Sequence, residues 1–224
     1  MTVPKTRYRT SRPGLVLHSR PLPPHEVLVD GAMTSTTAAR TVVDVAATGD
    51  VRAAIVLADS ALRTGTGRPE LEAALPASRS TRGRRLAELV VDLADGRSGS
   101  PAESLARVVF RELGLPDPVL QHEFVVDGRR IVVDFWFPEQ GVVVEVDGRA
   151  KYTQSRYLGG RSPEQVFLDE KRRQELLLTV PDVRRMVRVE WRDLHLPEWL
   201  AHRLRSAGLP CAVRPGASAI LVAA

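Results

Sequence analysis

The sequence predicts a mixed α/β protein, with a mostly helical first part and a second part built on a mixed central sheet. Between residues 34 and 96, apolar residues recur at the spacing that is typical of helices. From residue 121 onward the pattern changes to short runs rich in valine and phenylalanine, which are typical of strands. The polar segment 97–100 separates the two patterns. We therefore expect a helical region over 1–96, an α/β domain over 97–208 and a tail over 209–224.

The first part is expected to begin with extended structure and to continue as helices. Residues 1–13 read as a basic arm, and short strands are expected over 14–20 and 26–31, separated by a proline-rich turn. Helices follow because candidate N-cap residues precede apolar runs, and glycines or prolines bound those runs. The expected helices span 34–47, 51–65, 68–76 and 84–96.

The second part is expected to follow the order αβββαβα. Its helices are expected over 100–116, 162–178 and 197–208, and its strands over 121–128, 129–137, 141–148 and 183–191. The first of these helices begins at Ser100, a favourable N-cap, and stops at Gly114 and Pro116. This order predicts a mixed sheet packed against helices.

Composition narrows the class of protein. The single cysteine among 224 residues rules out an internal disulfide and favours a reducing cytoplasm. No apolar run reaches the roughly 18 residues that a membrane span needs, so no membrane partner is expected. The net charge is +5, and only three of the 32 basic residues are lysines. Abundant arginine suits contact with phosphates, but a GC-rich genome also produces it, so a nucleic-acid partner must be argued from a site.

Three acidic residues in an apolar hairpin are the main functional signal. A tight turn at 138–141 would pair Phe137 with Val142, Phe135 with Val144 and Asp134 with Glu145. Because side chains alternate between the two faces of a strand, one face should be a continuous apolar surface. That face consists of Ile131, Val133, Phe135, Phe137, Val142, Val144 and Val146. The other face carries Asp134, Glu145 and Asp147, together with Val132, Trp136 and Val143.

Carboxylates brought this close require a compensating positive charge. Directly opposed side chains have Cβ atoms roughly 4.5–5.5 Å apart, and like charges at that distance repel. A divalent cation, Mg²⁺ or Mn²⁺, held by Asp134, Glu145 and Asp147 would compensate them. Such a metal could activate water and stabilise charge on a phosphate, with Lys151 steadying the phosphate. The alternatives are a cluster neutralised by arginines, for which Arg129, Arg130 and Arg172 are available, and a Lys151 that is only a solvated loop residue.

Other residues have two possible roles each. Glu103 either completes a capping box with Ser100 or reaches the hairpin and assists the metal. Arg172 and Asp169 are three residues apart on a helix, so they form a surface pair unless Arg172 turns toward a phosphate. Arg149, Lys171 and Arg172 are the basic residues expected to contact nucleic acid. The five histidines have no zinc-site spacing, and the apolar surroundings of Cys211 do not favour a thiolate nucleophile.

The second part resembles a known family. Residues 98–194 are similar to the domain-of-unknown-function family 559, which resembles the very-short-patch-repair endonucleases of the PD-(D/E)XK restriction-endonuclease-like superfamily. The likeness rests on SPAESLAR (100–107), VVDFWFP (132–138), VVVEVDG (142–148), Asp169 with Arg172, and VRRMVRVEWRDL (183–194). The resemblance implies a restriction-endonuclease-like domain over 97–208. Within that domain Asp134 is the first metal-binding acid, Glu145 and Asp147 are acids of the second strand, and Glu103 is an acid of the first helix.

Two departures from that pattern bear on the chemistry. Asp147 stands where the superfamily's second strand usually carries a lysine. Lys151 stands where members of the closer family often carry a histidine, so it is the candidate for a relocated lysine.

The first part also carries a resemblance. MTSTTAARTVVDVA (33–46) is similar to the linker region of actinobacterial proteins with an AbiEi-type, antitoxin-like domain. Those relatives commonly begin with a winged helix-turn-helix, so we expect either a truncated start or a version without that module. A toxin–antitoxin or defence partner and a homodimer are the partners to consider.

Together these arguments predict a metal-dependent endonuclease that hydrolyses phosphodiester bonds in DNA. The alternative is a non-catalytic nucleic-acid-binding or antitoxin-like regulatory protein on a nuclease scaffold, and a ribonuclease is a third option.

Overall fold

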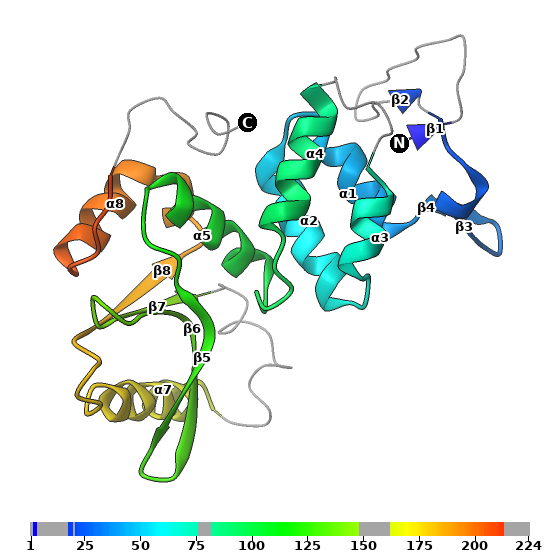
Figure 1. Ribbon diagram of the computed structural model, residues 1–224. Coiled ribbons are helices and arrows are strands. Elements are labelled where there is room, and N and C mark those ends of the chain that lie inside the picture. Colours follow the sequence, from blue (N-terminus) through cyan, green and yellow to red (C-terminus); the bar gives the residue numbers. More distant parts are fainter. Residues whose placement is uncertain (1, 4–17, 20, 76–81, 148–161, 213–224) are drawn as a thin grey trace. The chain divides into compact units, whose positions relative to one another are not determined.

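The computed structural model describes residues 2–3, 18–19, 21–75, 82–147 and 162–212 (Figure 1). The chain divides into two compact units, residues 1–96 and residues 97–224, and each is treated by itself below. Helices and a four-stranded mixed sheet together make this a mixed α/β fold, as the sequence predicts. No helix in the described ranges is long and apolar enough to cross a membrane.

The first unit consists of short strands followed by helices. Strands β1 (Thr2–Val3) and β2 (His18–Ser19) pair in parallel, and β3 (Val27–Asp30) and β4 (Met33–Thr36) form an antiparallel hairpin after the 3-10 helix η1 (Pro24–Glu26). The helices are α1 (Ala38–Ala46), α2 (Val51–Arg63), α3 (Arg68–Ala73) and α4 (Arg82–Leu93). Their buried faces meet, with Val42, Ile55, Leu71 and Val90 almost fully enclosed.

One element of the first unit differs from the sequence prediction. Residues 34–36 belong to β4 and not to the helix expected over 34–47, because Thr34, Ser35 and Thr36 pair with β3. β-branched residues such as threonine favour a strand over a helix. The helix begins one residue later, at the N-cap Thr37, whose side chain accepts a hydrogen bond from the backbone N–H of Arg40 at 3.2 Å.

The second unit has the expected αβββαβα order. Its helices are α5 (Pro101–Glu112), α7 (Pro163–Leu177) and α8 (Pro197–Ser206), and its strands are β5 (Val119–Val126), β6 (Arg129–Phe137), β7 (Val142–Asp147) and β8 (Arg185–Glu190). The strand order is β5-β6-β7-β8, antiparallel up to β7 and parallel between β7 and β8. Helices α5 and α8 lie on one face of the sheet and α7 lies on the other (Figure 1). The sheet is therefore buried on both sides.

The hairpin register is confirmed where the two strands pair. Phe135 lies opposite Val144 and Phe137 lies opposite Val142, as the turn at 138–141 predicts. The ladder between β6 and β7 does not extend to Asp134 and Glu145, so the directly opposed pair of acids expected there is wrong. On the other side of β6, Asp134 also lacks a ladder pair in β5, where Gln121 adopts a left-handed backbone with a φ of 49°.

This interruption divides the apolar face that was expected to be continuous. Phe135 and Phe137 pack edge-to-face on Phe110 of α5, with ring centroids 5.1 and 6.1 Å away. Ile131 and Val133 instead join the apolar cluster of Trp136, Val143 and Leu177. The prediction of a single apolar face from residue 131 to residue 146 is therefore wrong. Its strict alternation assumed an unbroken ladder through residue 134.

Candidate functional site

Asp134 lies where β6 and β7 part. Its Oδ2 accepts a hydrogen bond of 2.8 Å from the backbone N–H of Val146, and its Oδ1 lies 3.5 Å from Nε2 of Gln121. A continued ladder would satisfy the Val146 N–H with a backbone carbonyl of β6. Here the carboxylate does so, and it is held at a defined position between the strands.

Glu103 in the first turn of α5 is tied to Asp134 through one amide. Ser100 is the N-cap, since its Oγ accepts a hydrogen bond from the backbone N–H of Glu103 at 3.2 Å. The buried carboxylate of Glu103 accepts hydrogen bonds of 2.7 Å from Gln121 Nε2 and from the backbone N–H of Gly99. The capping box considered for Glu103 is therefore only half formed, because its carboxylate accepts from the N–H of Gly99 and not from that of Ser100. Through Gln121 the same carboxylate is linked to Asp134 of the hairpin.

Glu145 is a buried carboxylate with a guanidinium partner. It is only 6% exposed, and Nη2 of Arg173 on α7 donates to its Oε1 at 2.5 Å. The same nitrogen donates to the backbone carbonyl of Val132 at 2.5 Å. Burial alone would lower the pKa of Arg173, but Glu145, Glu170 and Asp134 together raise that pKa above its ordinary value. One cation therefore lies within the electrostatic reach of three carboxylates.

Asp147 at the end of β7 faces a second arginine. Nη1 of Arg188 on β8 lies 3.6 Å from Asp147 Oδ2, and its Nη2 donates to Glu170 Oε2 at 2.8 Å. Burial lowers the pKa of Arg188, but the charges of Asp147 and Glu170 and the hydrogen bond to Glu170 raise it overall. The cluster, defined here as Glu103, Asp134, Glu145, Asp147 and Glu170, is thus interleaved with two guanidinium groups.

The arginines that pair with the cluster are not those expected from the sequence. Arg130 bonds Glu123 on the neighbouring strand. Arg172 lies on the exposed side of α7, 4.0 Å from Asp169, and Lys171 forms a similar exposed pair with Glu175 at 3.8 Å. Lys171 and Arg172 therefore lie in the surface pairs of α7, and neither is part of the cluster. The predicted residues Arg149 and Lys151 lie outside the described residues.

One sequence feature is consistent with Arg173, and the position of Arg188 emerges only from the strand register. Glu170 and Arg173 are three apart on α7, so they share a helix face. Arg188 occupies the central position of β8 that pairs with Glu145 in the parallel register. The role of Arg173 depends on how α7 packs against the sheet and that of Arg188 on which strands are neighbours, and the sequence order alone gives neither.

The chemistry of the cluster suits a hard divalent cation, since Mg²⁺ and Mn²⁺ prefer carboxylate oxygens. Arg173 shows that a positive charge is accommodated beside Glu145 and Asp134. Across the described ranges, however, no three His, Cys, Asp or Glu side chains are grouped to hold one metal ion. A metal ion bound to Glu145 would compete with Arg173 for its carboxylate.

Comparison with known proteins yields distant relatives. The chain is 36% identical over 96 residues to uncharacterized proteins of two Mycobacterium tuberculosis strains, CDC 1551/Oshkosh and ATCC 25618/H37Rv. The match covers 42% of this chain and 35% of each relative, so the chain spans about a third of their length. No family model matches the chain. No solved structure matches it either.

Cys211 is a poor nucleophile by its environment. Burial raises the pKa of its thiol above the ordinary value of 9.0, and nearby Arg205 only partly offsets this. Because the thiolate is the reactive form, alkylation by iodoacetamide at pH 7.5 should be slower than for a free cysteine peptide. The rate should still be rising with pH above 9. A rate that levels off below pH 8.5 would contradict a raised pKa.

Proposed function

We propose that the second unit is a metal-dependent endonuclease that hydrolyses phosphodiester bonds, with DNA as the first substrate to test. The observation that carries the proposal is the position of Asp134 at the parting of β6 and β7. From there it is linked through Gln121 to Glu103, and it lies within the field of the cation that binds Glu145. Carboxylate oxygens are ligands that Mg²⁺ and Mn²⁺ prefer, and such bound metals promote phosphodiester hydrolysis.

The residues of the cluster and their partners would have different roles in this reaction. Asp134, Glu145 and Asp147 would hold Mg²⁺ or Mn²⁺, with Glu103 assisting, and the metal when bound would activate water and stabilise charge on the phosphate. Gln121 orients the carboxylates of Glu103 and Asp134 by donating to both. Arg173 neutralises Glu145 in the absence of a metal, and Arg188 keeps Asp147 and Glu170 together.

The test is cleavage of supercoiled plasmid with Mg²⁺ or Mn²⁺ against EDTA. Asp134→Asn keeps an acceptor for Val146 but removes the charge, so cleavage should fall at least about 100-fold, or roughly 2.7 kcal/mol in barrier. Glu139→Gln is the matched control, because Glu139 is an exposed acid in the turn of the same hairpin. Equal cleavage by the wild type and Asp134→Asn would refute the assignment.

A second candidate is a non-catalytic nucleic-acid-binding protein on a nuclease-like scaffold. It is favoured by the pairing of Glu145 and Asp147 with Arg173 and Arg188, which leaves the cluster compensated without a metal. Calorimetry with Mn²⁺ separates the two candidates. Heat of binding that is lost in Glu145→Gln favours the enzyme, whereas DNA binding without metal dependence or cleavage favours the scaffold.

A further inference from the structure

Two of the three tryptophans are exposed at the surface, although their side chains are large and mostly apolar. Trp136 is buried at 5% exposure, but Trp191 and Trp199 are 44% and 47% exposed. Both belong to the segment that leads from β8 into α8, and Leu196 between them is 53% exposed. Large apolar side chains gathered at a surface mark an interaction site more often than isolated ones do.

Hydrogen bonds and ring contacts fix the segment that carries the two exposed indole rings. Asp193 is 3% exposed, and its Oδ2 accepts a 2.8 Å hydrogen bond from the backbone N–H of Glu190. The same oxygen lies 3.5 Å from Nη1 of Arg203, whose guanidinium carbon lies 5.2 Å from the centroid of the Trp199 ring. Trp191 packs edge-to-face on His195, with centroids 5.5 Å apart. The rings are therefore positioned before any ligand arrives.

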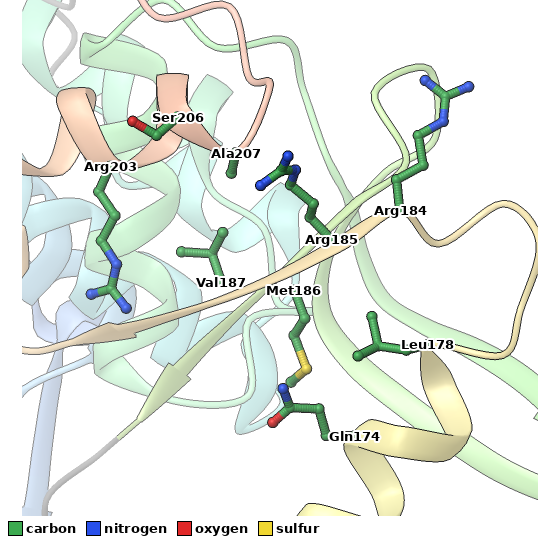
Figure 2. Close-up of a pocket in the computed structure, with 9 residues that line it drawn as sticks. All are labelled: Gln174, Leu178, Arg184, Arg185, Met186, Val187, Arg203, Ser206 and Ala207. Carbon is green, nitrogen blue, oxygen red and sulfur yellow. The ribbon is translucent and has the colours of Figure 1, made fainter.

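Arginines gather along the same segment and in a hollow that adjoins the tryptophans through Arg203. From residue 184 to residue 205 there are six arginines against three acids. A shallow hollow of about 380 Å³ is lined by Arg184, Arg185 and Arg203, among others. Figure 2 shows Arg185 and Arg203 on the α8 side of β8, reaching into the space between strand and helix, while Arg184 points away. No described residue pairs with the side chain of Arg184 or Arg185, so charge is available for an anionic partner.

This surface begins beside the carboxylate cluster. In the parallel register of β7 and β8, Asp147 lies opposite Glu190, and Trp191 is the next residue after Glu190. The carboxyl ends of both strands therefore lie at one edge of the sheet, with the cluster on β7 and the first tryptophan on β8. Nucleotides that stack on Trp191 would therefore lie near the end of β7 that carries Asp147.

We propose that the β8–α8 surface, defined by Arg185, Trp191, Trp199 and Arg203, binds single-stranded nucleic acid. Indole rings stack on bases of any sequence, and guanidinium groups attract the phosphates between them. The choice of a nucleic acid as the occupant rests on the proposed function and on the excess of arginine. The binding itself requires neither metal nor cleavage.

The test is fluorescence anisotropy with a labelled oligo(dT) probe of 20 nucleotides, in EDTA and low salt. Trp191→Ala and Trp199→Ala should each weaken binding at least about fivefold, the lower limit for one stacked base. Arg185→Ala and Arg203→Ala should weaken binding and lower the slope of log affinity against log salt by about 0.7 each. Val125→Ala is the matched control, since Val125 is an exposed apolar residue on β5, the opposite edge strand.

The proposal is overturned if the wild type does not bind the probe, or if both tryptophan variants bind it as tightly as the wild type. Unchanged circular dichroism excludes misfolding, and Trp191→Phe should restore part of the affinity because phenylalanine still stacks. Loss of cleavage in Asp134→Asn with unchanged oligo(dT) binding would leave this inference intact, so the two proposals can fail separately.

Discussion

Arg173→Ala is expected to destabilise the second unit by about 3 kcal/mol, the lower end of the range for removing one partner of a buried ion pair. The substitution leaves Glu145, which is 6% exposed, with a buried and uncompensated charge. It also removes the donor to the Val132 carbonyl. The lower end applies because the Arg173 side chain itself is 32% exposed, so water screens part of the interaction.

Tryptophan fluorescence is the appropriate measurement, since Trp136, Trp191 and Trp199 all belong to the second unit. The melting temperature of that unit should fall by about 10 °C. Arg172→Ala is the matched control. The side chain of Arg172 is 74% exposed, and its Nη1 lies 4.0 Å from Oδ1 of Asp169. That variant should change stability by less than about 0.5 kcal/mol. A similar loss of stability in Arg173→Ala and Arg172→Ala would show that the ion pair between Arg173 and Glu145 does not stabilise the unit.

The same variant tests whether the cluster accepts a metal. Without the guanidinium, Glu145 and Asp134 still need a cation, and Mn²⁺ can supply it. Saturation at 100 times the dissociation constant would restore about 2.7 kcal/mol. Millimolar Mn²⁺ should therefore raise the melting temperature of Arg173→Ala more than that of the wild type. An equal response in both proteins would argue against a metal at this position and favour the non-catalytic scaffold.

The fold of the second unit could be predicted because its elements are locally encoded. Ser100 begins α5, the Asp127-Gly128 turn joins β5 to β6, and the turn at 138–141 sets the register of Phe135 on Val144. The division of the apolar face could not be predicted. It depends on the left-handed Gln121 and on a hydrogen bond from Val146 to Asp134, and both belong to the assembled sheet.

The acids of the site were recognisable from the sequence, and their partners were not. Asp134 and Glu145 stand out because acids are rare in apolar strands. Glu103 was recognisable as the N3 acid that follows Ser100 and from the resemblance. Arg172 was named in place of Arg173, although successive residues of a helix point about 100° apart. Deciding which of the two faces the sheet requires the packing of α7 against it. Arg188 required knowledge that β8 pairs with β7 and not with β5.

Gly141→Ala should be among the most damaging single substitutions, with a loss of roughly 2–5 kcal/mol from strain and overpacking together. Gly141 has a φ of +64°, which alanine adopts only at a cost. A Cβ at this position would also lie 2.6 Å from the backbone oxygen of Asp182 and 2.8 Å from Cγ of Arg184. The Gly141 carbonyl accepts from the backbone N–H groups of Arg184 and Arg185, at 2.8 and 3.1 Å. Relieving the clash would lengthen these two hydrogen bonds and displace the start of β8.

Gly128→Ala separates the two causes. Gly128 has a similar φ of +73°, but nothing lies within 4 Å of the place where its Cβ would be. Its replacement should therefore cost only the backbone term, about 1–2 kcal/mol. The difference between the two variants, measured by tryptophan fluorescence in urea, isolates the contact between Gly141 and the segment that leads into β8. Because β8 begins with Arg185 and leads to Trp191, Gly141→Ala should also weaken oligo(dT) binding under conditions where the protein is still folded, whereas Gly128→Ala should not. If Gly141→Ala and Gly128→Ala lose the same stability and the same affinity for oligo(dT), then α7 and α8 alone position β8. The turn at 138–141 would then only connect β6 to β7.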